Sequence, residues 1–406
     1  MKAYERLLSY VKIFTPSNEE SAASPSSPCQ FDLAHHLVKE LKELGIRDAM
    51  VDEHCYVYAH LPASEGLEKA PALGLIAHMD TVSDFCDHPA APVITENYDG
   101  GPLALGDSGR VLSPEMFPHL PGLKGRTLIT SDGTTILGAD DKAGIAEIMT
   151  SLEHILKENI PHGPLCIAFT PDEEIGMGTA HFDLKKFGAD YAYTLDGDTE
   201  GEIQYENFNA CGAKVEFNGV NVHPGSAKNT MVNASLLAME FNSMLPGCDT
   251  PANTDDYQGF FHLLSMNGDV AHAKLHYIVR DHDAASFVFR QNTLRHITAL
   301  FNEKYGADTA VLTISQQYRN MKEIIDTCPW LITLAAEACR ACDVTPLIIP
   351  IRGGTDGAQL SFMGLPCPNL GTGGHAYHGP YEHITIEGMD AAVKVTLKII
   401  ELFSRK

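Results

Sequence analysis

Short apolar runs of strand length, each closely followed by an acidic residue or a histidine, are the clearest pattern along this chain. The runs lie at residues 72–77, 134–137, 165–170 and 191–195. Near-continuous apolar strands are typical of a sheet whose two faces are both covered. Open α/β sheets bind ligands at the carboxyl ends of their strands, so the polar groups after these runs are expected to meet there.

The polar groups after the runs have the chemistry of metal ligands. They are His78 and Asp80, Asp140 and Asp141, Glu173 and Glu174, Asp196, and, far along the chain, His378. Carboxylates and imidazoles suit divalent zinc, cobalt or manganese better than metals that prefer thiolates. An isolated His-x-Asp or Glu-Glu pair is common on protein surfaces, but the ordered set predicts a hydrolytic centre with two metal ions.

The clearest helical pattern begins after Asp141. Apolar residues continue at spacings of three and four from Ile145 to Leu156, which predicts a helix with one face on the sheet. The positive end of the helix dipole favours carboxylates at this start. We assign this structural role to Asp141 and keep Asp140 as a metal ligand.

A different pattern occupies residues 209–319. The order is strand, helix, two strands that form a hairpin around Asn267-Gly268, helix and strand. This is the order of a ferredoxin-like split unit. We therefore expect an inserted α+β lid domain at 209–319, and a catalytic domain formed by residues 1–208 and 320–406.

Two segments have no regular pattern. Residues 17–28 are rich in Ser, Pro and Ala and are interpreted as a surface loop. Residues 83–121 are dominated by Pro, Gly and Asp. A connection of that length is uncommon in a compact domain unless it is functional, so we expect a flap bordering the site.

Composition and charge narrow the class of protein. The 406 residues are 44% hydrophobic and 20% charged, which indicates a globular chain with about two domains. The net charge of −24 opposes nucleic acid and anionic membranes, so neither is expected as a partner. No apolar run reaches the roughly 18 residues of a membrane span, and residues 1–10 lack the core of a secretory signal. We expect a cytoplasmic location.

The ten cysteines are interpreted as reduced thiols and small core residues rather than as a disulfide framework. Cys339 and Cys342 form the only Cys-x-x-Cys. Without a second pair, and within a helical pattern, they are not expected to bind metal.

Several segments of the chain resemble the metal-binding motifs of the M20 metallopeptidases. They are His78-Met79-Asp80-Thr81, Gly138-Ala139-Asp140-Asp141-Lys142-Ala143-Gly144, Thr170-Pro171-Asp172-Glu173-Glu174-Ile175-Gly176, Leu195-Asp196-Gly197 and Tyr377-His378-Gly379. The resemblance spans nearly the whole chain, including Val222-His223-Pro224-Gly225. It implies an α/β fold in which a mixed sheet flanked by helices forms a zinc exopeptidase-like catalytic domain, with the ferredoxin-like lid inserted.

The resemblance also implies a ligand set and a cofactor. His78 and Asp196 would hold one zinc ion, and Glu174 and His378 would hold the other. Asp140 would bridge the two ions together with a water or hydroxide. This corresponds to two Zn²⁺ per subunit, with Co²⁺ or Mn²⁺ as substitutes. Composition alone does not choose among the neighbouring histidines; only the Tyr-His-Gly motif selects His378.

Roles for the remaining site residues follow. Glu173 would take the proton of the water and pass it to the leaving amine. Asp80, two residues after His78, can accept the second N–H of that imidazole and fix its tautomer. By resemblance, the Asp140-Asp141 peptide bond would be cis.

Substrate-binding residues are expected in and beside the lid. The resemblance assigns His223 to the tetrahedral oxyanion, although a histidine before Pro-Gly is also an ordinary turn residue. Arg280 and Arg352 are suited to bidentate capture of the terminal carboxylate of a peptide. For each arginine, an ordinary salt bridge is the alternative.

The function implied is removal of the N-terminal residue from tripeptides, with small peptides as substrates. A dipeptidase, carboxypeptidase or N-acyl amino acid deacylase of the same family would share the metal residues. A non-catalytic metal-dependent binding protein is the alternative from another class. The sequence leaves open whether the protein forms a homodimer, because lid domains of related proteins can pair across subunits.

Overall fold

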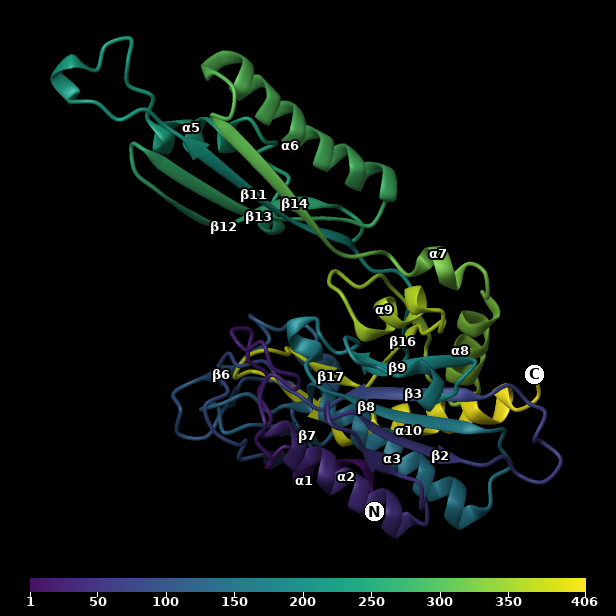
Figure 1. The fold of residues 1–406 in the computed structure, drawn as a ribbon. Helices are drawn as coiled ribbons and strands as arrows, with labels where there is room; N and C mark the ends of the chain where they lie inside the picture. Colours follow the sequence, from purple (N-terminus) through teal and green to yellow (C-terminus); the bar gives the residue numbers. More distant parts are fainter. The chain divides into compact units, whose positions relative to one another are not determined.

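The computed structural model describes all residues from 1 to 406, and they form two compact units. The larger unit comprises Met1–Tyr205, Glu323–Ile349 and Thr355–Lys406, and the smaller comprises Glu206–Lys322 and Pro350–Gly354. Figure 1 labels helices and strands of both units. None of the helices combines the length and the apolar character that crossing a bilayer would require.

The larger unit is built on an eight-stranded sheet. The sheet is mixed, as the family resemblance implied. In spatial order the strands are β1 (Met50–Val51), β2 (Val57–Leu61), β8 (Leu165–Thr170), β3 (Leu73–His78), β9 (Tyr191–Gly197), β16 (Asn369–Gly371), β10 (Glu202–Gln204) and β15 (Leu347–Ile348). The central strand β3 is parallel to both β8 and β9, whereas β2 is antiparallel to β8. All six residues of β3 and of β8 are buried, as expected for strands with both faces covered.

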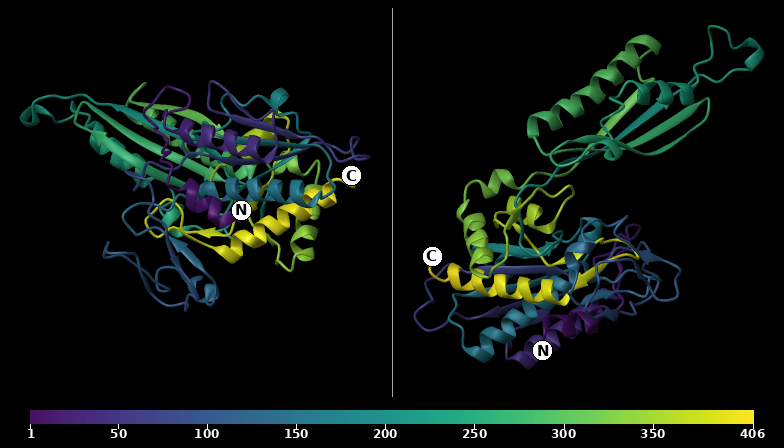
Figure 2. Two further views of the ribbon diagram at one scale, coloured as in Figure 1. Left: turned by 90° about the horizontal axis from the view of Figure 1, so that it is seen from below. Right: turned by 180° about the vertical axis from the view of Figure 1, so that it is seen from behind.

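Helices cover one face of this sheet. They are α1 (Ala3–Tyr10), α2 (Gln30–Leu44), α3 (Ala139–Glu158) and α10 (Ile386–Phe403), and α8 (Trp330–Ala341) packs on α10. Figure 2 shows α1, α3 and α10 running side by side. The central helix α3 packs on β3 and β9, so its first turn lies at the ends of those strands.

The other face of the sheet is covered by a separate apolar cluster. Ile76 of β3 packs there with Phe182, Phe187 and Leu360. Two short helices, α4 (Leu184–Phe187) and α9 (Asp356–Met363), supply Phe187 and Leu360. The remaining short helical segments are η1 (Leu120–Leu123), η2 (Glu173–Ile175) and α7 (Lys322–Ile325), together with η3 (Pro224–Ser226) and η4 (Pro251–Asn253).

Residues 83–121 form their own small structure. Three short strands lie within them, β4 (Val93–Thr95), β5 (Leu103–Ala104) and β6 (Val111–Leu112). β4 joins a four-stranded sheet with β7 (Leu128–Thr130), β18 (His383–Thr385) and β17 (Gly374–His375). A cluster of buried leucines with Tyr98 packs beneath the segment, so its length reflects a local core rather than an unstructured connection.

The prediction of a strand at residues 134–137 is wrong. The structure has no strand there, and β7 ends earlier, at Thr130. Side-chain hydroxyl groups form hydrogen bonds with backbone carbonyls there instead. Ser131 Oγ donates to the Thr135 carbonyl at 2.6 Å, and Thr135 Oγ1 donates to the Phe85 carbonyl at 2.7 Å. Side-chain hydrogen bonds of this kind offer the chain an alternative to a sheet ladder.

The smaller unit has the strand and helix order predicted for residues 209–319. Its antiparallel sheet has the order β12 (Phe260–Gly268), β13 (His272–Asp281), β11 (Asn209–Asn218) and β14 (Ala310–Tyr318). Two helices, α5 (Ala234–Ser243) and α6 (Ala284–Tyr305), pack on it around a core that contains Phe217, Phe241 and Phe301. The unit also includes Pro350–Gly354, which the sequence analysis placed in the catalytic part.

The hairpin turn of the smaller unit lies later than predicted. Asn267 and Gly268 are still paired within the β12–β13 ladder, and the turn begins at Asp269. Asp269 Oδ1 accepts hydrogen bonds from the amides of Ala271 at 2.7 Å and His272 at 3.0 Å. The turn therefore forms where an aspartate side chain can satisfy the backbone.

All ten cysteines are free thiols, as expected.

Candidate metal centre

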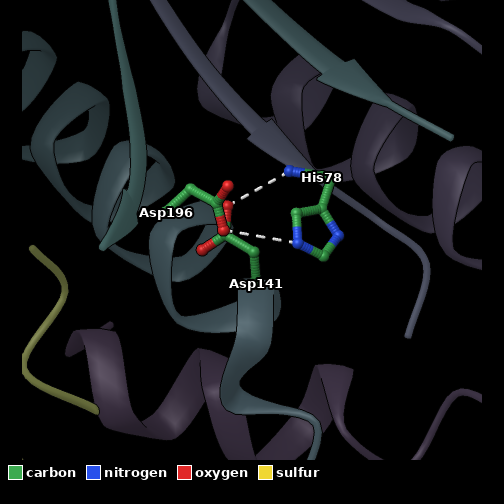
Figure 3. A group of neighbouring side chains, drawn as sticks. All are labelled: His78, Asp141 and Asp196. Atoms are coloured by element: carbon green, nitrogen blue, oxygen red, sulfur yellow. Dashed lines mark hydrogen bonds and ion pairs between the residues drawn. The ribbon is translucent and has the colours of Figure 1, made fainter. Parts of the chain in front are cut away.

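The ends of the central strands bring together the five residues predicted as metal ligands. His78 ends β3, Asp196 lies near the end of β9, Glu174 follows β8 in η2, Asp140 begins α3, and His378 lies between β17 and β18. Figure 3 shows His78 and Asp196 facing each other, with Asp141 beside them.

Both histidines contact carboxylates through Nε2. His78 Nε2 lies 2.9 Å from Asp140 Oδ1 and 3.4 Å from Asp196 Oδ1. His378 Nε2 lies 3.1 Å from Asp140 Oδ2 and 3.1 Å from Glu174 Oε2. Asp140 therefore presents one carboxylate oxygen to each histidine.

The tautomer of His78 fits metal binding. Its Nδ1 lies 3.0 Å from the carbonyl oxygen of Asp80, which can only accept, so Nδ1 carries a proton. The Nε2 of a neutral ring then turns its lone pair toward the carboxylates of Asp140 and Asp196. Ligand atoms on one tetrahedral zinc lie about 3.3–3.5 Å apart, given bonds of about 2.0–2.1 Å. The 3.4 Å between His78 Nε2 and Asp196 Oδ1 lies in this range, whereas the other three distances, 2.9–3.1 Å, are shorter and are those of hydrogen bonds. The imidazole and carboxylate donors fit a cation by their chemistry.

Electrostatics at the centre favour a cation. Burial raises the pKa of Glu174 to about 7, and the charge of Asp140 adds to the shift. Burial also raises the pKa of Asp196. Hydrogen bonds to Asp140 and Glu174 raise the pKa of His378 to about 11. Buried carboxylates that repel one another in this way are stabilised by positive charge.

Asp80 organises more of the centre than the sequence predicted. The expected contact is present, since Asp80 Oδ1 lies 3.3 Å from His78 Nδ1. The same carboxylate accepts the amide of Glu173 at 3.0 Å through Oδ1 and the amide of Glu174 at 3.2 Å through Oδ2. Asp80 thus connects the end of β3 to the turn after β8.

Asp141 has a structural role at the start of α3. Its Oδ2 accepts the amide of His78 at 3.1 Å, and its Oδ1 accepts the amide of Gly144 at 3.1 Å. A Cβ at Gly144 would lie 2.0 Å from the Leu195 carbonyl oxygen, so only glycine allows the helix to approach β9 this closely. The Asp140-Asp141 peptide bond is cis, as the resemblance implied.

Glu382 holds the backbone of Asp140 and was missed by the sequence analysis. It is 1% exposed and accepts the amides of Gly138 at 2.7 Å and Asp140 at 3.0 Å. Burial raises its pKa to about 7. The available signal was a glutamate four residues after His378, directly before the short buried strand β18.

Asp356 is a second buried carboxyl that the sequence analysis missed. It is 3% exposed, begins α9, and accepts a hydrogen bond from Thr170 Oγ1 at 2.8 Å at the end of β8. No periodicity in the sequence marks it, because it follows the irregular segment that contains Gly353 and Gly354.

The other histidines near His378 form a separate cluster. The His119 and His375 rings stack with centroids 4.3 Å apart, and His119 Nε2 lies 2.9 Å from His383 Nε2. Of the three histidines between 375 and 383, it is His378 that contacts Asp140 and Glu174.

The candidate substrate-binding residues lie in the smaller unit. His223 is exposed, and its Nδ1 accepts the amide of Gly225 at 3.1 Å. Arg280 is 9% exposed, and its Nη1 donates to the carbonyls of Cys211 at 3.2 Å and Val279 at 3.0 Å.

Arg352 contacts backbone carbonyls rather than a carboxylate of the chain. It donates to the carbonyl oxygens of Asp256 at 2.6 Å, Gln258 at 3.0 Å and Thr254 at 3.2 Å. Its guanidinium also lies 5.1 Å from the ring centroid of Phe208. The salt bridge that was the alternative for this residue is absent.

This chain is similar in sequence to a family of peptidases and to individual peptidases. Residues 133–402 match the model of the family described as peptidase family M20/M25/M40. A Peptidase T of Bacillus cereus (strain G9842) is 50% identical over 404 residues, which cover 99% of this chain and 98% of that protein. A Peptidase T of Bacillus thuringiensis (strain Al Hakam) is 49% identical with the same coverage.

Solved structures with the same fold include two at high similarity. The aminopeptidase PepT from Bacillus cereus ATCC 10987 has a TM-score of 0.79 and 21% identity, with coverage of 99% of this chain and 98% of that chain. A tripeptidase from Staphylococcus aureus subsp. aureus Mu50 has a TM-score of 0.77 and 23% identity, with coverage of 100% and 98%. At these identities the likeness shows the fold.

Proposed function

Because the chain belongs to peptidase family M20/M25/M40 and is a peptide hydrolase, we propose that it is a di-zinc aminopeptidase that removes the N-terminal residue from tripeptides. The observation that carries the metal part is the carboxylate of Asp140, whose two oxygens face His78 and His378 separately. The substrate part is supported by the relatives named Peptidase T at 50% identity over nearly the whole chain.

In the proposed centre His78 and Asp196 would hold one cation, Glu174 and His378 would hold a second, and Asp140 would serve both. Imidazole and carboxylate donors suit Zn²⁺, and Co²⁺ or Mn²⁺ could substitute. When bound, such cations act as Lewis acids and lower the pKa of water from about 15.7 toward 7.

The side chains of the chain would handle the protons. In this proposal a carboxylate oxygen of Glu173 takes a proton from the attacking water and delivers it to the nitrogen of the leaving amine. Glu173 is suited to this role because its carboxyl makes no hydrogen bond, whereas the carboxyl of Glu174 contacts His378. Asp80 would keep both glutamates in place through their amides and fix the ring of His78.

Residues of the smaller unit are proposed for substrate recognition. His223 is the candidate for stabilising the oxyanion. Arg280 and Arg352 are the candidates for the carboxylate at the end of the peptide. For Arg352 this binding requires the guanidinium to exchange backbone carbonyls for the carboxylate.

The cellular setting is also a proposal. Ten free thiols support a reducing compartment such as the cytoplasm. Small peptides would be the partners rather than nucleic acid or membrane, given the net charge of −24. The proposed assembly is a homodimer, which light scattering on the purified protein would test.

A substrate panel tests the proposed function. Zinc-loaded protein should hydrolyse an unblocked tripeptide with kcat/KM about tenfold or more above that for the matching dipeptide, tetrapeptide and N-acetylated tripeptide. Mass spectrometry should identify the N-terminal amino acid as the released product. Protein treated with a chelator is the control.

Other outcomes of the panel point elsewhere. Faster turnover of the dipeptide or of an acetylated amino acid would assign the chain to another activity of the same family. Release of the C-terminal residue would make it a carboxypeptidase. Binding of tripeptide to zinc-loaded protein without any turnover would support a non-catalytic binding protein.

A further inference from the structure

The loop of residues 15–29, with Gln30 as the first residue of α2, is here called the N-terminal loop. Its two ends are buried, unlike the surface loop predicted for residues 17–28. Its beginning contacts the segment that carries Asp80. Ser17 donates to the Thr81 carbonyl through its amide at 3.0 Å and its hydroxyl at 3.2 Å. The amide of Thr81 in turn donates to the Thr15 carbonyl at 3.1 Å. Ser17 is 3% exposed, so this contact is buried.

The end of the same loop binds the carboxylate of Asp172. Asp172 Oδ2 accepts the amide of Ser26 at 2.7 Å. Asp172 Oδ1 accepts the hydroxyl of Ser26 at 2.5 Å and Nε2 of Gln30 at 2.7 Å. The exposed fractions of Ser26, Gln30 and Asp172 are 5%, 0% and 2%, so the network is shielded from water.

This network continues into the backbone of the turn that carries Glu173. The amide of Asp172 donates to Gln30 Oε1 at 3.2 Å, and the amides of Glu173 and Glu174 donate to the carboxylate of Asp80 at 3.0 and 3.2 Å. Consecutive amides are therefore each bonded to a side chain from another segment. The carbonyls of Asp172 and Glu173 also accept amides within the turn, from Met177 at 2.9 Å and Gly176 at 2.7 Å.

The position of Glu173 depends on this backbone. Its carboxyl has no hydrogen bond of its own, so the turn, whose Glu173 amide is bonded to Asp80, sets the point from which the side chain projects. Asp172 has a φ of 57°, in the left-handed region that aspartate tolerates better than most residues. Catalytic groups lose rate steeply when they are displaced by about 1 Å, so a firmly held turn has a functional consequence.

We propose that Ser26, Gln30 and Asp172 form a clamp through which the N-terminal loop positions Glu173 for catalysis. The proposal rests on the proposed role of Glu173 as general base. In it, Asp172 and Gln30 are positioning residues that act through the backbone of the turn and do not touch the substrate. The competing explanation is that the buried network only stabilises the fold.

A reciprocal exchange of side chains separates these explanations. In Asp172→Asn an amide nitrogen replaces an acceptor and faces the donors of Ser26 or Gln30. In Gln30→Glu an oxygen replaces the donor and faces the Asp172 carboxylate. Asp172→Asn therefore places a donor against donors, and Gln30→Glu places an acceptor against an acceptor, so each single variant loses a hydrogen bond of the network. In the double variant the amide introduced at position 172 can donate to the carboxylate introduced at position 30, which restores the bond with its direction reversed.

The expected result is a selective loss of turnover that the exchange recovers. With saturating zinc, each single variant should lower kcat by about 10- to 100-fold with KM changed little. The double variant should recover most of the lost kcat. The bound zinc and the thermal midpoint should be measured for every variant, so that rates refer to folded, loaded protein.

Two further variants complete the design. Ser151→Ala removes another buried serine hydroxyl of the same unit, which donates to the Glu147 carbonyl at 2.8 Å, and it should leave kcat unchanged. Ser26→Ala removes one bond of the clamp and should lower kcat by a smaller factor. If a single exchange variant does not fold, Ser26→Ala and the double variant carry the test.

A second readout does not need catalysis. Hydrogen exchange of the amides of residues 172–176 should become faster in the single variants and in Ser26→Ala, and should return toward the wild-type rate in the double variant. Unchanged exchange there, or a loss of thermal stability with kcat per folded molecule unchanged, would overturn the clamp. Absence of peptide hydrolysis by the wild-type protein would instead refute the proposed function, and the exchange data would still decide whether the clamp holds the turn.

Discussion

Glu173→Gln is expected to keep its bound zinc and to lose kcat by about 10²–10⁴-fold, the range contributed by a general base. Glutamine preserves the length of the side chain but cannot take up a proton. The side chain of Glu173 makes none of the ion pairs found among His78, Asp140, Asp196, Glu174 and His378. Metal binding should therefore survive the change, and the loss should appear in the chemical step rather than in substrate binding.

The measurement is steady-state turnover of a tripeptide together with zinc content after gel filtration. Glu337→Gln, an exposed glutamate on α8, is the matched control and should behave as wild type. Turnover near the wild-type rate in Glu173→Gln would remove the general-base role. A loss of zinc that parallels the loss of turnover would show that Glu173 acts as a ligand.

Asp140→Ala is expected to lose both metal and activity. Its carboxylate contacts His78 through one oxygen and His378 through the other, so its removal deletes a ligand from both proposed positions at once. Mutating a residue that hydrogen-bonds to a metal ligand lowers metal affinity by about 10- to 100-fold, and loss of a shared direct ligand should exceed that range. Wild-type protein should carry two zinc ions per chain, and the variant fewer than one.

Metal content by elemental analysis, at several free zinc concentrations, checks this result. Asp390→Ala, a partly exposed aspartate of α10, serves as the control for the loss of an acidic residue. Two zinc ions retained in Asp140→Ala would refute the shared ligand. One zinc ion in the wild-type protein would refute the pair of cations while leaving a single-metal centre.

The local pattern of apolar residues correctly predicted the strands and the helix that hold the metal-ligand candidates. The apolar runs before His78 and Asp196 form β3 and β9, and the helix that begins beside Asp140 is α3. These elements follow from periodicity, because strands with both faces covered and a helix with one apolar face have distinct spacings. The same reasoning failed at residues 134–137, where hydroxyl groups of Ser131 and Thr135 satisfy the backbone without a strand.

Supporting residues were harder to find than candidate ligands. Glu382 binds the amide of Asp140 across 242 positions of sequence, and Gln30 binds Asp172 across 142. Each is an unremarkable polar residue in its own segment. Each matters because of its hydrogen-bond partner, and the spacing of residues within a segment does not identify a partner in another segment.

The sequence by itself determined most of the main elements, because these depend on periodicity along the chain. Its motifs, through their resemblance to a family, determined the fold class and the set of candidate ligands. Only the tertiary structure decided which carboxylate oxygen of Asp140 faces which histidine, that Arg352 binds carbonyls, and that the N-terminal loop reaches Asp172. The physical reason is that buried polar groups must find partners wherever packing brings them, and packing joins segments that are distant along the chain.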